Sequence, residues 1–271
     1  MAKIKDEKGI TLMELLIALL LTFIVGSAAL EFYVSQHNQW LVQEQISDMQ
    51  QNARATMNEL ATNIRMAGYG MPQGVQYIYG ADTNPDTITI VLSRGPGCDV
   101  TIEHAMPQPS AELRCDGHDL SCFNDDEWAY IFDPNTNTGE FFYITHVQYA
   151  ASHIQHNTMP LSKSYPKGSY VISMDLIKYY IDNTTDPTHP AFMRIKNFGT
   201  PEEYAEDIEE LQFVYTLSDG TTTNSPAAGD VVKSVEFTLR AKTARADEDF
   251  LGNSGFRKRT LASQVFIRNS S

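Results

Sequence analysis

The sequence reads GITLMELLIALLLTFIVGSAAL over residues 9–30, and from Ile10 onward almost every side chain in this run is apolar. A helix needs about 20 apolar residues to cross a hydrocarbon core about 30 Å thick. The run therefore predicts a membrane-spanning helix. Residues 1–8 are polar and carry three lysines, a basic flank that places the N-terminus in the cytoplasm and the rest of the chain outside.

Glu14 is the strong exception within the apolar run. A carboxylate in a bilayer is costly unless it is paired or protonated, so an ionisable group there indicates a function. We therefore expect Glu14 to pair with another charge.

The helical pattern continues beyond the membrane segment. No proline occurs between the apolar run and Pro72, and no glycine between Gly26 and Gly68, so we expect one helix from about Thr11 to about Met66, about 80 Å long. Its outer half carries apolar side chains at three- and four-residue steps, which predicts a stripe packed against the rest of the chain. These residues are Trp40, Leu41, Ile46, Met49, Ala53, Met57, Leu60 and Ile64.

The chain after the helix favours short antiparallel strands. Seven stretches are rich in β-branched and aromatic residues and are bounded by turn residues. They are residues 87–92, 128–132, 140–145, 170–174, 178–181, 211–215 and 235–239. Residues 133–139 and 218–220 are typical hairpin connections. The expected fold class is α+β, a long N-terminal hydrophobic spine helix followed by an antiparallel β-rich globular head.

The charge balance and the missing motifs limit the classes of function. The chain of 271 residues has a net charge of −14, and between residues 67 and 239 there are 24 acidic and 8 basic side chains. Binding of nucleic acid requires clustered cations, so none is expected. The sequence lacks a Gly-x-Ser-x-Gly elbow, a Gly-rich phosphate loop and a His-Glu-x-x-His pair. We therefore expect no catalytic residues, no cofactor and no enzymatic activity.

Three cysteines, Cys98, Cys115 and Cys122, lie in one loop-rich stretch. In an extracytoplasmic head, two of them are expected to form a disulfide and one to stay free. The sequence leaves the pair open, although Cys115 and Cys122 enclose the shortest loop. Zinc held by these cysteines and His118 is an alternative, disfavoured because the spacing is not a common one. No metal is expected.

Two other polar patterns are expected to be structural. Asp133, Asn135 and Asn137 alternate like calcium ligands, but Gly139 stands one place late for an EF-hand, so a hairpin turn is the better interpretation. The acidic residues 124–127 and the pair His153 and His156 are expected at the surface.

Residues 9–18, GITLMELLIA, resemble the processing site of type IV prepilins and pseudopilins. In that family a prepilin peptidase cleaves after the glycine and methylates the new N-terminus, and a glutamate stands fifth in the mature chain. The resemblance implies cleavage after Gly9, N-methylation of Ile10, and charge pairing of Glu14 with the α-amino group of a neighbouring subunit. Ile10 departs mildly from the usual Phe or Met.

Both ends of the chain resemble PilW-type minor pilins. Residues 54–69, which close with the phrase RMAGY, are similar to the end of that family's helix, and residues 205–215, 232–240 and 266–269 are similar to its last strands. Residues from about 80 to 170 show no such match. GspJ, a minor pseudopilin of type II secretion, is similar in general plan and is the nearest alternative.

The resemblance implies three segments: a leader over residues 1–9, a transmembrane and assembly helix over residues 10–66, and a periplasmic or extracellular head over residues 67–271. The subunit would be single-pass in the inner membrane with its head in the periplasm, and would reach the pilus or cell surface after assembly. Its expected partners are other minor pilins, the major pilin, prepilin peptidase, the inner-membrane assembly platform and membrane lipid. Its expected role is to initiate or cap pilus assembly.

Two further interpretations stay open. The triplet Ser27-Ala28-Ala29 follows an apolar run, as a conventional signal peptidase site requires, so a secreted or membrane-anchored periplasmic hydrolase is an alternative. A binding module, with a tip-exposed acidic head that meets a partner, is compatible with the pilin interpretation.

Overall fold

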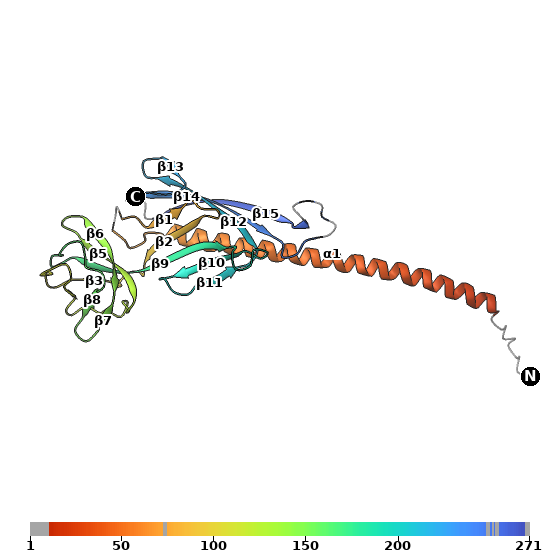
Figure 1. Cartoon of the computed structure of the whole chain (residues 1–271), viewed down its shortest axis with the longest axis horizontal. Helices are drawn as coiled ribbons and strands as arrows, with labels where there is room; N and C mark the ends of the chain where they lie inside the picture. Colours follow the sequence, from red (N-terminus) through yellow and green to blue (C-terminus); the bar gives the residue numbers. More distant parts are fainter. Residues whose placement is uncertain (1–10, 73–74, 248–249, 251, 253–254, 269–271) are drawn as a thin grey trace, which may run out of the picture. The chain divides into compact units, whose positions relative to one another are not determined.

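A computed structural model describes residues 11–72, 75–247, 250, 252 and 255–268 of the chain. Its single long helix, α1 (Leu12–Met66), has 55 residues and confirms the predicted helix (Figure 1). The helix ends where Gly68 takes a φ of +69°, a left-handed conformation that favours glycine, and the amide of Gly68 then donates to the carbonyl of Val91 at 2.9 Å.

The chain forms two compact units, residues 1–48 and 49–271, so the division falls inside α1. In the first unit the described helix is exposed throughout its apolar segment. By length and composition, α1 is the one helix in the described part of the chain that is able to cross a membrane, and none of its apolar window is buried.

In the second unit, one face of α1 is built into the core of the head. The buried positions recur at steps of three or four residues, as a packed helical face requires. They are Met49, Ala53, Thr56, Leu60 and Ile64. The predicted stripe is thus confirmed in part: Met57 is only half-buried, whereas Trp40 and Leu41 are exposed because they precede the unit in which the packing occurs.

The largest sheet of the head is organised around β9 (Tyr170–Asp182). Its main path is β1 (Ile78–Ala81), β2 (Thr87–Ser93), β9, β10 (Ala191–Lys196) and β11 (Glu202–Ala205). The strands β3 (Asp99–Thr101) and β5 (Glu127–Asp133) also pair with β9, and β6 (Thr138–Ile144) pairs with β5.

The separation of residues 170–174 and 178–181 into two strands was wrong. They belong to one strand of 13 residues, because β3 and β5 pair with its first half while β2 and β10 pair with its second half. Asp175 is held within the strand by Arg94, whose Nε lies 3.0 Å from its carboxylate.

Two smaller sheets complete the head. The first has the order β13 (Thr222–Thr223), β12 (Ile208–Leu217), β14 (Val232–Lys242) and β15 (Lys258–Phe266). The second has the order β4 (Leu113–Arg114), β8 (His153–Gln155) and β7 (His146–Gln148).

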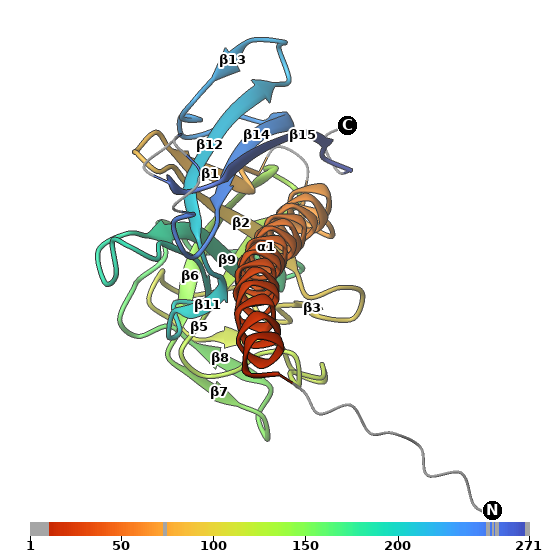
Figure 2. The ribbon, with the colours of Figure 1, turned by 90° about the vertical axis from the view of Figure 1, so that its right-hand side faces the viewer.

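All described strand pairs are antiparallel, which with α1 gives the expected α+β class. Within the head, β5 to β8 gather in one region and β12 to β15 in another (Figures 1 and 2). The region around β5 to β8 has an apolar core of its own. That core includes Leu113, Phe123, Ile131, Phe142, Ile154 and Val171.

Candidate functional site

The first described turn of α1 brings Thr11 and Glu14 together. The amide and the hydroxyl of Thr11 donate to Glu14 Oε2 at 2.9 and 3.0 Å, and the amide of Glu14 donates to Thr11 Oγ1 at 3.3 Å. This reciprocal arrangement is a capping box, which satisfies amide groups that a helix start leaves without partners. The spacing Thr-x-x-Glu signals it in the sequence, although only the charge of Glu14 entered the prediction.

Gly9 and Ile10, the predicted cleavage and methylation sites, lie outside the described residues. Both roles therefore stay predictions. The charge pairing of Glu14 with a second subunit is likewise a prediction, since its described hydrogen bonds are with Thr11 of the same chain.

Between Leu12 and Leu30 the surface of α1 is apolar over nearly its whole circumference, with Glu14 as the charged exception. Its large apolar side chains are exposed, and Leu12 reaches 80% exposure. They include Leu16, Leu20, Phe23, Ile24, Leu30 and Val34. Monomeric soluble proteins rarely expose a contiguous apolar area of this kind, which marks a surface for lipid or for other proteins.

An aromatic row follows the apolar segment on α1. Tyr33, His37 and Trp40 are spaced by four and three residues, and their rings stack with centroids 6.2 and 6.1 Å apart. Aromatic side chains of this kind gather at the boundary between lipid and water. The row thus lies on the helix beyond the segment that is able to span the membrane.

The cysteines divide into a pair and a single thiol. Cys98 and Cys122 form a disulfide with a Cα–Cα distance of 5.3 Å, and Cys115 is free and buried. Burial, with the negative charges of Asp116 and Glu103, raises the pKa of the Cys115 thiol to about 12. The disulfide takes up two of the four side chains that the zinc site would need. Among the described residues, no group of three or more His, Cys, Asp or Glu side chains is placed to hold a metal.

Histidines of the head lie beside carboxylates. Asp116 contacts two of them, with His104 Nε2 and His153 Nε2 each 3.0 Å from one of its oxygens, and His153 Nδ1 lies 3.0 Å from Glu112.

His156 is buried, and its ring nitrogens lie 2.8 and 3.2 Å from backbone carbonyl oxygens. Its expected surface position was therefore wrong, because it fills an apolar core and pairs with the backbone.

The predicted hairpin turn after β5 is confirmed. Asp133 accepts hydrogen bonds from the amide of Asn135 at 3.0 Å and the hydroxyl of Thr136 at 2.8 Å, and Asn137 has a φ of 52°. These contacts with its own turn are typical of aspartate in a loop. The carboxylate therefore serves the hairpin connection between β5 and β6.

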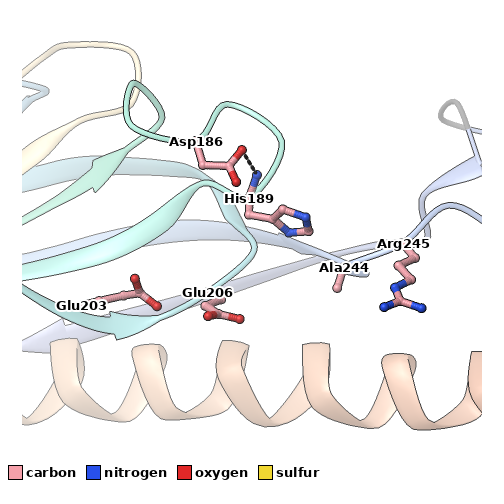
Figure 3. Close-up of a pocket in the computed structure, with 6 residues that line it drawn as sticks. All are labelled: Asp186, His189, Glu203, Glu206, Ala244 and Arg245. Atoms are coloured by element: carbon pink, nitrogen blue, oxygen red, sulfur yellow. Dashed lines mark hydrogen bonds between the residues drawn. The ribbon is translucent and has the colours of Figure 1, made fainter.

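A polar pocket of about 460 Å³ is lined by β11 and by the segments that follow β9, β11 and β14 (Figure 3). Its lining residues are Asp186, His189, Glu203, Glu206, Ala244 and Arg245. The amide of His189 donates to Asp186 at 3.3 Å, and its Nδ1 lies 3.0 Å from Asp207. These six lining residues include three carboxylates and one histidine, and no serine, threonine or cysteine.

No protein-family model matches the chain. No curated protein matches it. Among solved structures, a type IV-like pilin from Thermus thermophilus is similar over 82% of this chain and 97% of its own, with 11% sequence identity and a TM-score of 0.40.

Proposed function

We propose that this protein is a type IV pilin-like subunit, anchored and assembled through the apolar part of α1, and that it acts as a minor pilin which initiates or caps pilus assembly. The observation that carries the proposal is the division of α1. Its apolar N-terminal part is fully exposed, whereas its C-terminal part contributes Met49, Ala53 and Leu60 to the core of the head. Such a helix is suited to lie in lipid and then to pack against the helices of other subunits.

The residues at the start of the helix support processing by prepilin peptidase. Gly9 and Glu14 match the family residues for cleavage and charge pairing, and Ile10, which departs from the usual Phe or Met, stands at the position of methylation. We propose that cleavage frees the α-amino group of Ile10 and that this cation pairs with Glu14 of a neighbouring subunit. Pairing removes two isolated charges from an apolar environment at the same time.

The capping box gives Glu14 a role before assembly as well. While the subunit waits in the membrane, Thr11 donates two hydrogen bonds to the carboxylate, so the charge is partly satisfied within one chain. An incoming α-amino group adds a full opposite charge beside the same carboxylate. Glu14 is therefore both a local cap and a site for the next subunit.

The N-terminus of the mature protein tests the proposal. Intact-mass and N-terminal analysis should show a chain that starts at Ile10 with a methylated amine. A start at Leu30, after the triplet Ser27-Ala28-Ala29, would remove the apolar helix and favour a secreted hydrolase instead. Deletion of the chain should reduce surface pili; loss of protein secretion with normal pili would instead favour the minor pseudopilin alternative.

A further inference from the structure

Three aromatic rings form an open corner on the head. Trp128 on β5 and Tyr143 on β6 are a cross-strand pair with ring centroids 5.8 Å apart and an interplanar angle of 70°. Phe198, which follows β10, lies 5.8 Å from Trp128 at 45°. The side chain of Phe198 is 67% exposed, and the other two rings are half-buried. The corner therefore presents ring surface to the solvent.

Phe198 holds this position in an unfavourable backbone conformation. Asn197 and Phe198 have φ angles of 49° and 59°, and the amide of Gly199 donates to the carbonyl of Lys196 at 2.8 Å. Two-residue turns with both central φ angles positive favour Asn followed by Gly, and a bulky residue at the second place is strained. Because the ring stays mostly exposed, burial in the core does not offset this strain. A bulky, exposed residue in such a strained conformation indicates that its ring serves a function such as binding and not the stability of the fold.

A polar network fixes the turn that carries Phe198. The side chain of Asn197 accepts a hydrogen bond from the amide of Leu176 and donates to Asp175, both at 2.8 Å. Asp175 also accepts from Arg94 Nε at 3.0 Å. The turn is thereby held to the middle of β9.

The same network fixes the strand that carries Trp128. Both terminal nitrogens of Arg94 donate to Glu127 at 2.7 Å, and Nη1 donates to the carbonyl of Cys122 at 2.8 Å. Glu127 precedes Trp128, and Cys122 is half of the disulfide. One arginine thus ties together the two elements that form the corner. A surface fixed in this way loses little conformational freedom when it binds a ligand.

The charge around the corner selects the kind of ligand. The hydroxyl of Tyr143 donates to Asp126 at 3.3 Å, and this carboxylate is exposed at the rim. Ring faces carry a negative potential, and rings set at an angle to one another with an acid beside them suit a cation. A sugar ring would instead stack flat against a single open aromatic face.

We propose that the corner formed by Trp128, Tyr143 and Phe198, with Asp126 at its rim, binds a protonated lysine or arginine side chain of a partner protein. The acidic head, with 24 acidic and 8 basic side chains between residues 67 and 239, attracts such a basic partner from a distance. The binding surface belongs to the head alone and does not depend on the assembly of α1.

The fluorescence of Trp128 provides the test. The chain has two tryptophans, so Trp40→Phe leaves Trp128 as the single reporter. The full chain in neutral detergent micelles is titrated with hexalysine and with the same peptide acetylated on every side chain. Hexalysine should change the emission saturably, and the acetylated peptide should bind at least about tenfold more weakly, because acetylation removes the cation.

Two variants locate the site. Phe198→Gly removes the ring and relieves the positive φ, so the variant should unfold at an equal or higher temperature while hexalysine binds at least about threefold more weakly. Asp126→Asn should weaken binding by a similar factor. Tyr170→Thr removes a 40% exposed ring elsewhere on the head and should leave the affinity unchanged. Equal binding of the acetylated peptide, or an unchanged affinity in a folded Phe198→Gly variant, would overturn the proposal.

Discussion

The hydroxyl of Tyr179 on β9 donates a 2.7 Å hydrogen bond to the carboxylate of Glu59 on α1. Arg194 Nη1 donates to the same oxygen at 3.0 Å, and Asn63 donates to the Tyr179 hydroxyl at 2.9 Å. Burial raises the pKa of Glu59, but the hydrogen bonds from Tyr179 and Arg194 outweigh it and leave the pKa below its usual value. This polar cluster fixes the end of α1 against two strands of the head.

Glu59→Gln should destabilise the head by about 1–3 kcal/mol, because Arg194 loses a charged partner within a partly buried cluster. Urea unfolding of the full chain in detergent, followed by Trp128 fluorescence in the Trp40→Phe background, measures the change. Glu44→Gln, an exposed position on the same helix, is the matched control and should change stability by less than about 0.5 kcal/mol. Equal losses of stability in the two variants would show that the cluster around Glu59 adds no more to the free energy of unfolding than an exposed glutamate does.

The lowered pKa of the Glu103 carboxylate leads us to expect that the head loses stability in acid. Hydrogen bonds from His118, Lys167 and Thr101 lower its pKa from 4.5 to about 2. A pKa that is lower in the folded state stabilises the fold fully above about pH 4.5, and this contribution is lost as the pH falls toward 2.

The difference in unfolding temperature between the wild type and Glu103→Gln measures that contribution. It should be constant between pH 7 and about pH 5 and should shrink between about pH 4.5 and pH 2. A difference that persists unchanged at pH 2 would mean that Glu103 acts through packing and not through its charge.

We expect the number of cysteine thiols that react with a thiol reagent to depend on whether the chain is folded. The native chain should react with a thiol reagent at no site, because Cys98 and Cys122 are bonded and the buried Cys115 has a pKa of about 12. Denatured chain without reductant should show one thiol, and denatured, reduced chain should show three. Rapid labelling of the native protein would contradict the buried thiol.

Removal of the disulfide should also destabilise the head. Replacement of Cys98 and Cys122 by serine opens a link across a sequence separation of 24 residues. The expected loss is about 3 kcal/mol in the free energy of unfolding. Cys115→Ala is the control, because it removes a cysteine and leaves the disulfide intact. Its loss of unfolding free energy should come only from the small cavity that the substitution leaves.

The elements that depend on local pattern could be predicted from the sequence. The apolar run and the absence of proline before Pro72 and of glycine between Gly26 and Gly68 predicted α1 to within one residue at its start. The strands β2, β5, β6, β12 and β14 each coincide with a predicted run of β-branched and aromatic residues. The capping box was also predictable, because it depends only on the spacing of Thr11 and Glu14.

The remaining features depend on contacts between distant residues. β15 is a mostly exposed strand without apolar alternation, and it is defined by its pairing with β14. Cys98 and Cys122 meet at β9, where the amide of Ser173 donates to the carbonyl of Cys98 at 2.9 Å and its hydroxyl donates to the carbonyl of Cys122 at 2.8 Å. Likewise, the burial of His156 depends on a carbonyl group 45 residues away. No local pattern carries such information.

Thr11 provides a way to separate the two roles proposed for Glu14. If Glu14 acts only as a cap, Thr11→Ala should impair incorporation into filaments at least as much as Glu14→Gln, because glutamine at this position can still complete the capping box. If Glu14 also pairs with the α-amino group of a neighbour, Glu14→Gln should impair incorporation far more than Thr11→Ala, because only the first removes the charge. We expect the second result, measured as the amount of subunit in sheared filaments relative to the amount in the membrane. Both variants should remain inserted, since neither makes the helix less apolar. Equal incorporation of Glu14→Gln and the wild type would contradict the charge pairing.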